Sequence, residues 1–154
     1  MMSETIQREG KSQDGQALVE FTLVFVLFVM LMFMIIEGAR LILAYSTVSH
    51  AARAGVRYAI VRGSGSTCGT GCPATPADIE QVVRKNASTL NLTKVEVCWW
   101  KTTPDCVNNP ADAKNKGMGS IIQVRAQYDF SPVVGLIAQT KVSLSSSAQM
   151  VIAQ

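Results

Sequence analysis

The stretch GQALVEFTLVFVLFVMLMFMII, residues 15–36, decides how this chain folds. From residue 17 onward it is apolar except for Glu20 and Thr22. Twenty apolar residues are what an α-helix needs to cross about 30 Å of hydrocarbon. Hydrophobic residues make up 48% of the chain and charged residues only 16%, a balance that favours a membrane protein over a solvated or disordered one. We therefore expect a transmembrane helix here.

Residues 1–15 precede the apolar stretch and are polar, with charges of both signs. We expect them to form a disordered leader. A secretory signal peptide is cleaved after an apolar run of about 7–15 residues. The run is longer here, so a processing site would have to lie before it or be absent.

A helical pattern continues beyond the apolar stretch. Residues 38–62 contain no proline, and their polar side chains recur at spacings of four, three and four residues. This spacing places them on one stripe of a helix. The other faces are apolar, so this part of the helix is amphipathic and needs a partner surface. We predict one transmembrane and stalk helix over residues 16–62, with a polar stripe formed by Ser46, His50, Arg53 and Arg57.

Residues 63–154 are predicted to form a small α+β domain. It opens with a glycine-rich loop, followed by Thr75 as N-cap and Pro76 at the first position of a short helix that we expect to end near Leu90. Alternating apolar residues then predict a small antiparallel sheet. Its three strands are expected over residues 93–99, 122–130 and 142–152.

Two adjacent tryptophans, Trp99 and Trp100, stand at the end of the first expected strand. Successive side chains of a strand point to opposite faces. One tryptophan is therefore predicted to lie in the core and the other on a contact surface.

Several classes of function have no support in the sequence. The net charge is only +3, and the basic residues form no run interleaved with aromatics, so nucleic acid is not an expected partner. The glycines of residues 63–71 are not followed by the Lys-Ser/Thr pair of a phosphate-binding loop. No nucleophilic serine motif or pair of carboxylates stands out. We therefore expect that the protein is not an enzyme and has no cofactor.

The chain has four cysteines, all after the apolar stretch, a usage that indicates an oxidising compartment. Local pairing, Cys68 with Cys72 and Cys98 with Cys106, is the simplest of three connectivities. A zinc site is the rival interpretation, but these spacings differ from paired zinc knuckles and the one histidine lies on the stalk helix. A thiol-disulfide active site usually has two residues between its cysteines, unlike either pair here.

The start of the apolar stretch carries the sharpest functional signal. Glu20 interrupts it five residues after Gly15, and a carboxylate costs about 2.5–3.5 kcal/mol at the centre of a membrane helix. One interpretation is a glutamate that reaches the membrane surface. The other, which we prefer, is that cleavage after Gly15 frees an α-amine on Gln16, and Glu20 supplies the countercharge for such an amine in a neighbouring subunit.

Residues 15–59 resemble the TadE-like family of minor pilins, or pseudopilins, from tight-adherence (Tad/Flp) pilus systems. Tyr128–Pro132 and Ser146–Met150 resemble the last two strands of that family. Many relatives have a proline in the apolar helix near the position of Val26. This chain has valine there, so the resemblance does not imply a kinked helix. The resemblance in the N-terminal part is carried by Val19, Glu20, Phe21, Glu37, Gly38, Arg40, Ala51, Ala52, Arg53, Ala54, Gly55, Arg57 and Ala59.

The resemblance implies processing by a prepilin peptidase at Gly15–Gln16 and an assembly role for Glu20 and Phe21. It further implies a cytoplasmic leader, a single span of the bacterial inner membrane, an extracytoplasmic C-terminal domain, and a place in the membrane or in an extracellular pilus. The expected partners are the membrane, the peptidase, other pilins and inner-membrane assembly proteins.

One observation argues against this orientation. Arg8 and Lys11 precede the span, whereas four arginines and no acid occur between Gly38 and Ala77, and positive charge normally stays on the cytoplasmic side. The processing signature and the cysteines outweigh it in our interpretation. The alternative is an unprocessed, bitopic membrane-anchored module whose extracytoplasmic domain binds a ligand. A membrane-tethered redox or metal enzyme has little support.

Overall fold

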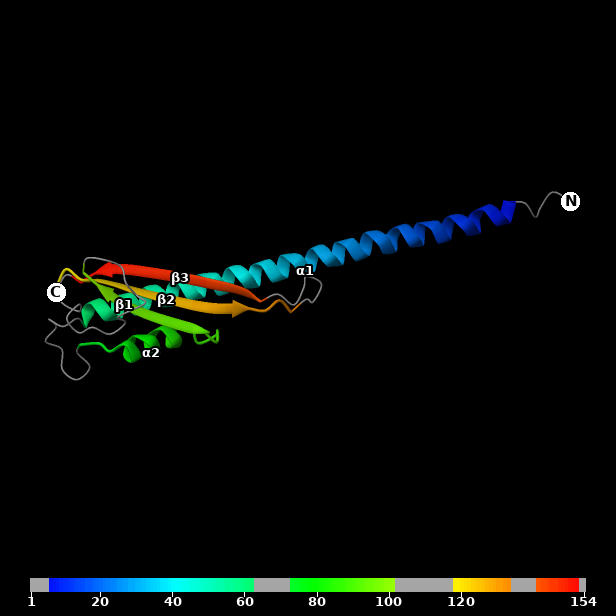
Figure 1. Ribbon diagram of the computed structural model, residues 1–154. Helices are drawn as coiled ribbons and strands as arrows, with labels where there is room; N and C mark the ends of the chain where they lie inside the picture. Colours follow the sequence, from blue (N-terminus) through cyan, green and yellow to red (C-terminus); the bar gives the residue numbers. More distant parts are fainter. Residues whose placement is uncertain (1–5, 63–72, 102–117, 134–140, 153–154) are drawn as a thin grey trace. The chain divides into compact units, whose positions relative to one another are not determined.

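The computed structural model describes residues 6–62, 73–101, 118–133 and 141–152 (Figure 1). A long helix is followed by a short one and by three strands, which confirms the predicted α+β class. Two compact units are formed, Met1–Ala39 and Arg40–Gln154. The elements are α1 (Ile6–Val61), α2 (Pro76–Asn86), β1 (Lys94–Trp100), β2 (Ile121–Phe130) and β3 (Val142–Val151).

In the first unit, α1 begins at Ile6, so the expectation of a disordered leader is wrong for residues 6–15. These residues include glutamine, arginine, glutamate and lysine, which are good helix formers, and no proline. A helix already nucleated downstream extends at little cost, because each added residue adds a hydrogen bond. The two glycines in this stretch cost about 1 kcal/mol each and do not end the helix.

The apolar residues of the first unit are not covered by the rest of the protein. Among the described residues, Gly15–Val61 is the one helix long and apolar enough to cross a membrane, and its most apolar window is entirely unburied. Phe21, Leu23 and Met34, for example, are each more than 60% exposed. This length and composition match the predicted membrane span.

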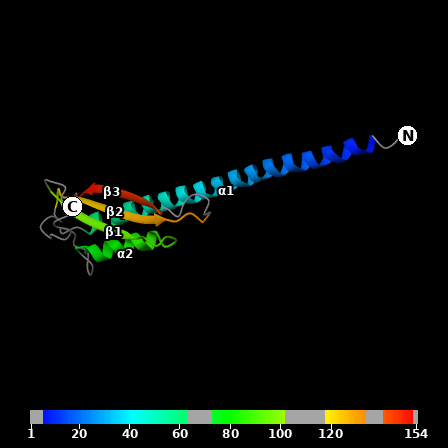
Figure 2. The same ribbon diagram turned by 45° about the vertical axis from the view of Figure 1, so that its right-hand side comes forward.

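In the second unit, the C-terminal part of α1 has one buried face. Buried side chains recur along it at the spacing of an α-helix, as an amphipathic helix requires. Figures 1 and 2 show this part of α1 running along the sheet, next to the strands. The buried face consists of Ala44, Val48, Ala51, Ala52, Val56 and Ala59.

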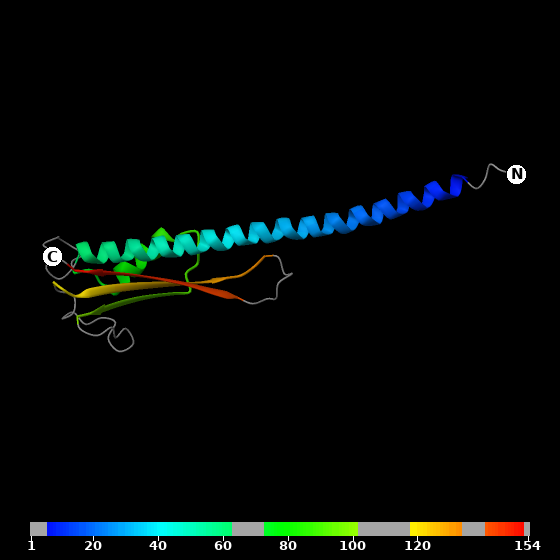
Figure 3. The ribbon, with the colours of Figure 1, turned by 90° about the horizontal axis from the view of Figure 1, so that it is seen from above.

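The close approach of α1, α2 and β2 depends on Gly55. A Cβ atom at this position would lie 2.5 Å from Cγ2 of Val83 on α2 and 3.4 Å from Cγ1 of Val124 on β2. Both valines are fully buried. Figure 3 shows α1 and α2 on the same face of the sheet, and the absent side chain lets the three elements meet.

The sheet has the order β1-β2-β3 with antiparallel neighbours, as predicted. Its register pairs Val97 with Val124 and Val124 with Ala148. Residues directly opposite each other share a face. The alternating apolar residues of β2 thus continue on both neighbours, and Ile122, Val124 and Ala126 are completely buried against the helices.

The two tryptophans do point to opposite faces, because Trp99 pairs with Ile122 and Trp100 with Ile121. Trp99 belongs to the core cluster. Trp100, however, is only 7% exposed. The predicted contact surface at this position is therefore wrong, because a buried ring is not available to a partner.

Helix α2 begins as predicted and ends earlier. The Thr75 hydroxyl accepts a hydrogen bond from the Asp78 N–H, and the Asp78 carboxylate accepts one from the Thr75 N–H, which completes a capping box. The helix ends at Asn86 rather than near Leu90. Ala87 leaves the helical region with φ −110° and ψ 35°, and a turn brings Leu90 back onto the core.

Candidate functional site

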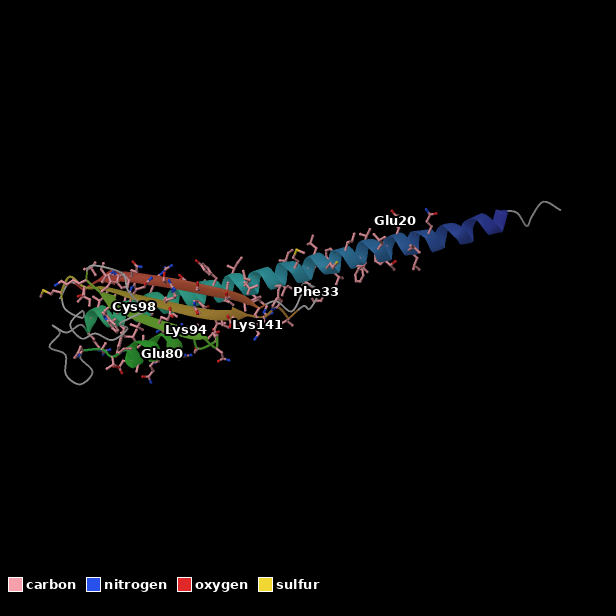
Figure 4. All side chains as sticks on the ribbon, viewed as in Figure 1. Glu20, Phe33, Glu80, Lys94, Cys98 and Lys141 are labelled. Carbon is pink, nitrogen blue, oxygen red and sulfur yellow. The ribbon has the colours of Figure 1, made fainter. Side chains whose placement is uncertain are left out.

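The four residues predicted to act in processing and assembly lie together on α1. Gly15, Gln16, Glu20 and Phe21 are all exposed, and Figure 4 shows the Glu20 side chain projecting from the helix surface. Helical spacing of four residues makes Gln16 and Glu20 neighbours on one face. A new α-amine on Gln16 would therefore be formed about one helical turn, some 5–6 Å, from Glu20.

Two side chains next to Glu20 make contacts within their own helix. Thr22 Oγ1 donates a hydrogen bond of 2.9 Å to the carbonyl oxygen of Val19. The ring of Phe21 stacks on that of Phe25 with 6.0 Å between centroids. The structure describes no hydrogen bond or ion pair of the Glu20 carboxylate within the chain. Glu20 is the one charged residue between Gly15 and Ile36.

The peptide bond between Gly15 and Gln16 lies inside α1. Its backbone therefore takes part in the helix and is not presented as an extended strand. A protease acts on the transiently opened state of such a segment. Gly15 lowers the cost of opening, since glycine is the poorest helix former after proline, and no atom lies within 4 Å of the position of its missing Cβ.

Of the four cysteines, only Cys98 is among the described residues. It lies on β1, is 4% exposed and is in a disulfide. Its partner is not among the described residues. Cys68, Cys72 and Cys106 fall outside them as well, so the expected pairings remain predictions. The described part of the chain contains no cluster of three or more His, Cys, Asp or Glu residues that could hold a metal ion.

The polar stripe of the second unit is exposed as the spacing predicts. Arg53 Nη2 donates a hydrogen bond of 3.0 Å to Ser49 Oγ, one turn earlier on the same helix. Other arginines of this unit do pack on the protein: the Arg40 guanidinium lies 5.6 Å from the centroid of the Phe130 ring, and that of Arg62 lies 4.2 Å from the centroid of Tyr58. The stripe faces away from the core cluster.

Sequence reasoning missed the role of Gly55. Gly55 was assigned only to the family resemblance and was given no role in packing. The signal was present, because Ala51, Gly55 and Ala59 form a row of small residues four apart, and such a row marks a face where backbones approach closely. The structure divides the block into these buried small residues and the exposed Arg53 and Arg57.

A comparison with protein families finds a similarity in the N-terminal part of the chain. Residues 15–57 match the family model described as TadE-like protein. The match begins at Gly15, includes Glu20, and ends at Arg57, so the resemblance in this segment is confirmed. The resemblance of the last two strands lies outside the match and stays an interpretation. No curated protein and no solved structure matches the chain.

Proposed function

We propose that this protein is a minor pilin or pseudopilin that takes part in assembling or initiating a tight-adherence, type IV-like pilus after cleavage by a prepilin peptidase. The observation that carries the proposal is the TadE-like match over residues 15–57, which begins at the glycine of the processing signature and includes Glu20. The exposed apolar helix that follows supports membrane anchoring.

The proposed mechanism rests on charge pairing in a medium of low dielectric. Removal of residues 1–15 leaves a positive α-amine on Gln16 at the start of the apolar helix. The carboxylate of Glu20 in a neighbouring subunit forms an ion pair with this amine. The pairing offsets part of the free-energy cost of holding the carboxylate in lipid. Both charged groups lose their hydration when they pair, and this cost offsets much of the electrostatic attraction. The ion pair therefore contributes little net stability, and its main effect is to favour subunits that assemble in the correct register.

The expected surroundings follow from this role. The leader lies in the cytoplasm, α1 crosses the bacterial inner membrane once, and the Arg40–Gln154 unit is extracytoplasmic, where the disulfide of Cys98 is stable. The partners are the prepilin peptidase, other pilins and inner-membrane assembly proteins. In this proposal the chain binds and assembles, and it has no enzymatic activity of its own.

An unprocessed, membrane-anchored binding module is the second candidate. One observation favours it: the Gly15–Gln16 bond lies within a continuous helix. In that case the chain keeps its leader, and Glu20 reaches the membrane surface without pairing.

The assembly role of Glu20 can be tested by substitution in the full chain. Glu20→Ala removes a charge that opposes insertion, so protein level and leader cleavage should persist. Co-purification with the other pilins and the number of surface pili should fall, because the amine of the neighbouring subunit loses its countercharge. Glu20→Gln keeps the size of the side chain and should show the same loss.

Thr22→Ala is the matched control. Thr22 is the other non-apolar residue of the stretch, but its hydroxyl bonds to its own helix at Val19, so its removal should leave assembly intact. If Glu20→Ala assembled as well as the parent protein, the pairing mechanism would be wrong and Glu20 would be a residue of the membrane surface.

A further inference from the structure

The outward face of α1 in the second unit changes character along its length. At its beginning Ile42 and Leu43 are each 67% exposed. About two to four turns further on, the same side of the helix presents His50, Arg53 and Arg57, all exposed. The buried face of this helix is fully used in the core, so the outward face is available to another molecule.

Among the described residues, no ion pair joins His50, Arg53 or Arg57 to an acidic side chain. No Asp or Glu occurs between Gly38 and Ala77. The described hydrogen bond of Arg53 goes to the neutral Ser49 hydroxyl. Two acids of the second unit pair with other side chains, Glu80 with Arg84 at 2.8 Å and Glu96 with Lys94 at 2.6 Å.

The position of the stripe argues against lipid headgroups as its ligand. Arg53 comes seventeen residues after Ile36, the end of the apolar stretch. At about 1.5 Å per residue this is about 25 Å along a helix. The headgroup layer extends only about 5–8 Å beyond the hydrocarbon, which is less than this length of helix.

We propose that this face, Ile42 and Leu43 followed by His50, Arg53 and Arg57, binds a second membrane-anchored helix that is apolar next to Ile42 and acidic next to the arginines. A helix rising from the same membrane meets the face in this order, with apolar side chains first. Carboxylates four or three residues apart on that helix match the spacing of the basic residues. Charge complementarity of this kind sets register and partner choice.

This inference shares only the extracytoplasmic orientation with the proposed function. In that orientation, four arginines close behind the span oppose the charge rule for membrane insertion. A role in binding would explain why the chain has these arginines although they oppose the charge rule.

Photocrosslinking in native membranes tests the proposal with the full chain. The crosslinking residue benzoylphenylalanine replaces Ser46, which is exposed between the apolar and basic parts of the face; in a control it replaces Ser145, exposed on β3. We expect an adduct specific to position 46, whose crosslinked peptide comes from a membrane-anchored protein and carries at least two carboxylates. Arg53→Glu with Arg57→Glu should reduce its yield about tenfold.

Three comparisons complete the test. Lys85→Glu with Lys101→Glu reverses the same number of exposed charges on α2 and after β1 and should leave the yield unchanged. Arg53→Lys with Arg57→Lys keeps the charge and should retain most of it. Exchanging the partner's carboxylates for lysines should restore the adduct of the Arg53→Glu, Arg57→Glu variant.

Adducts with lipid, with a nucleic acid or polysaccharide, or with a second copy of this chain would overturn the proposal. So would a protein adduct that persists after charge reversal. Leader cleavage is measured in the same membranes, so a failure of the binding face is distinguished from a failure of the pilin assignment. Resistance of the Arg40–Gln154 unit to added protease shows that each variant is folded.

Discussion

Two regions of the same helix have opposite relations to the rest of the protein. Between Gly15 and Ile36 nearly every side chain of α1 is exposed although almost all are apolar. From Ala44 to Ala59 the apolar side chains on one face are buried and the opposite face is polar. The first region contains large residues such as Phe21 and Leu27, whereas the buried face of the second consists of alanine, valine and glycine.

The difference shows that residue size, and not only hydrophobicity, distinguishes a lipid-facing helix segment from a protein-facing one. Lipid adapts to bulky side chains, so size there is unrestricted. A sheet and a second helix packed on α1 leave room only for small residues, as the 2.5 Å approach at Gly55 shows. Substitutions placed in the two regions should therefore have unequal effects.

The largest effect is expected for Gly55→Leu. The new side chain must displace Val83 and Val124, both fully buried, and overpacking of this kind costs about 1–3 kcal/mol or more. We expect the free energy of unfolding of the Arg40–Gln154 unit to fall by about 3 kcal/mol, measured by denaturation of the full chain in detergent. Gly38→Leu is the matched control, because no atom lies within 4 Å of its Cβ position. Equal stability of the two variants would contradict the close-approach argument.

A smaller effect is expected for Val56→Ala. Val56 is fully buried, so the loss of two methyl groups, with the cavity they leave, should cost about 2 kcal/mol. Val24→Ala removes the same atoms from a side chain that is 58% exposed in the first unit and should leave the unfolding midpoint of the second unit unchanged. A comparable shift for both variants would mean that the two regions do not differ as described.

The smallest effect concerns pH. Hydrogen bonds from the Thr75 hydroxyl and the Thr75 N–H lower the pKa of the Asp78 carboxyl. Because folding lowers this pKa, the stabilisation is present above the pKa of the unfolded chain, about 3.9, and is lost as pH falls through the folded value. Acidification below about pH 4 should lower the unfolding midpoint of the parent more than that of Asp78→Ala. An identical acid response in both proteins would exclude this contribution.

Much of the fold could be predicted because it depends on local pattern. Apolar length predicted the long apolar helix, spacing predicted the exposed stripe with Arg53 and Arg57, and alternation predicted the inner face of β2. The helical start at Ile6 and the end of α2 at Asn86 could not be placed, because helix ends depend on small differences in free energy. The burial of Trp100 depends on tertiary contacts, which the alternation of apolar and polar residues along one strand cannot predict.

The candidate site was predictable in part for a similar reason. Gly15 and Glu20 stand out because a glycine and a carboxylate are unusual beside an apolar helix. The structure shows no partner of the Glu20 carboxylate among the described residues, and the sequence alone does not identify one. Gly55 was missed because its importance comes from Val83 and Val124, which lie 28 and 69 residues further along the chain.

Intact-mass analysis of protein purified from the membranes of its host tests the central claim most directly. If Gly15 closes a leader and the apolar region is a processed membrane anchor, the mature chain begins at Gln16 and lacks the mass of residues 1–15. N-terminal sequencing of the same sample should then begin Gln-Ala-Leu-Val-Glu. A chain that still begins at Met1 or Met2, in a host with an active prepilin peptidase, would contradict the pilin assignment.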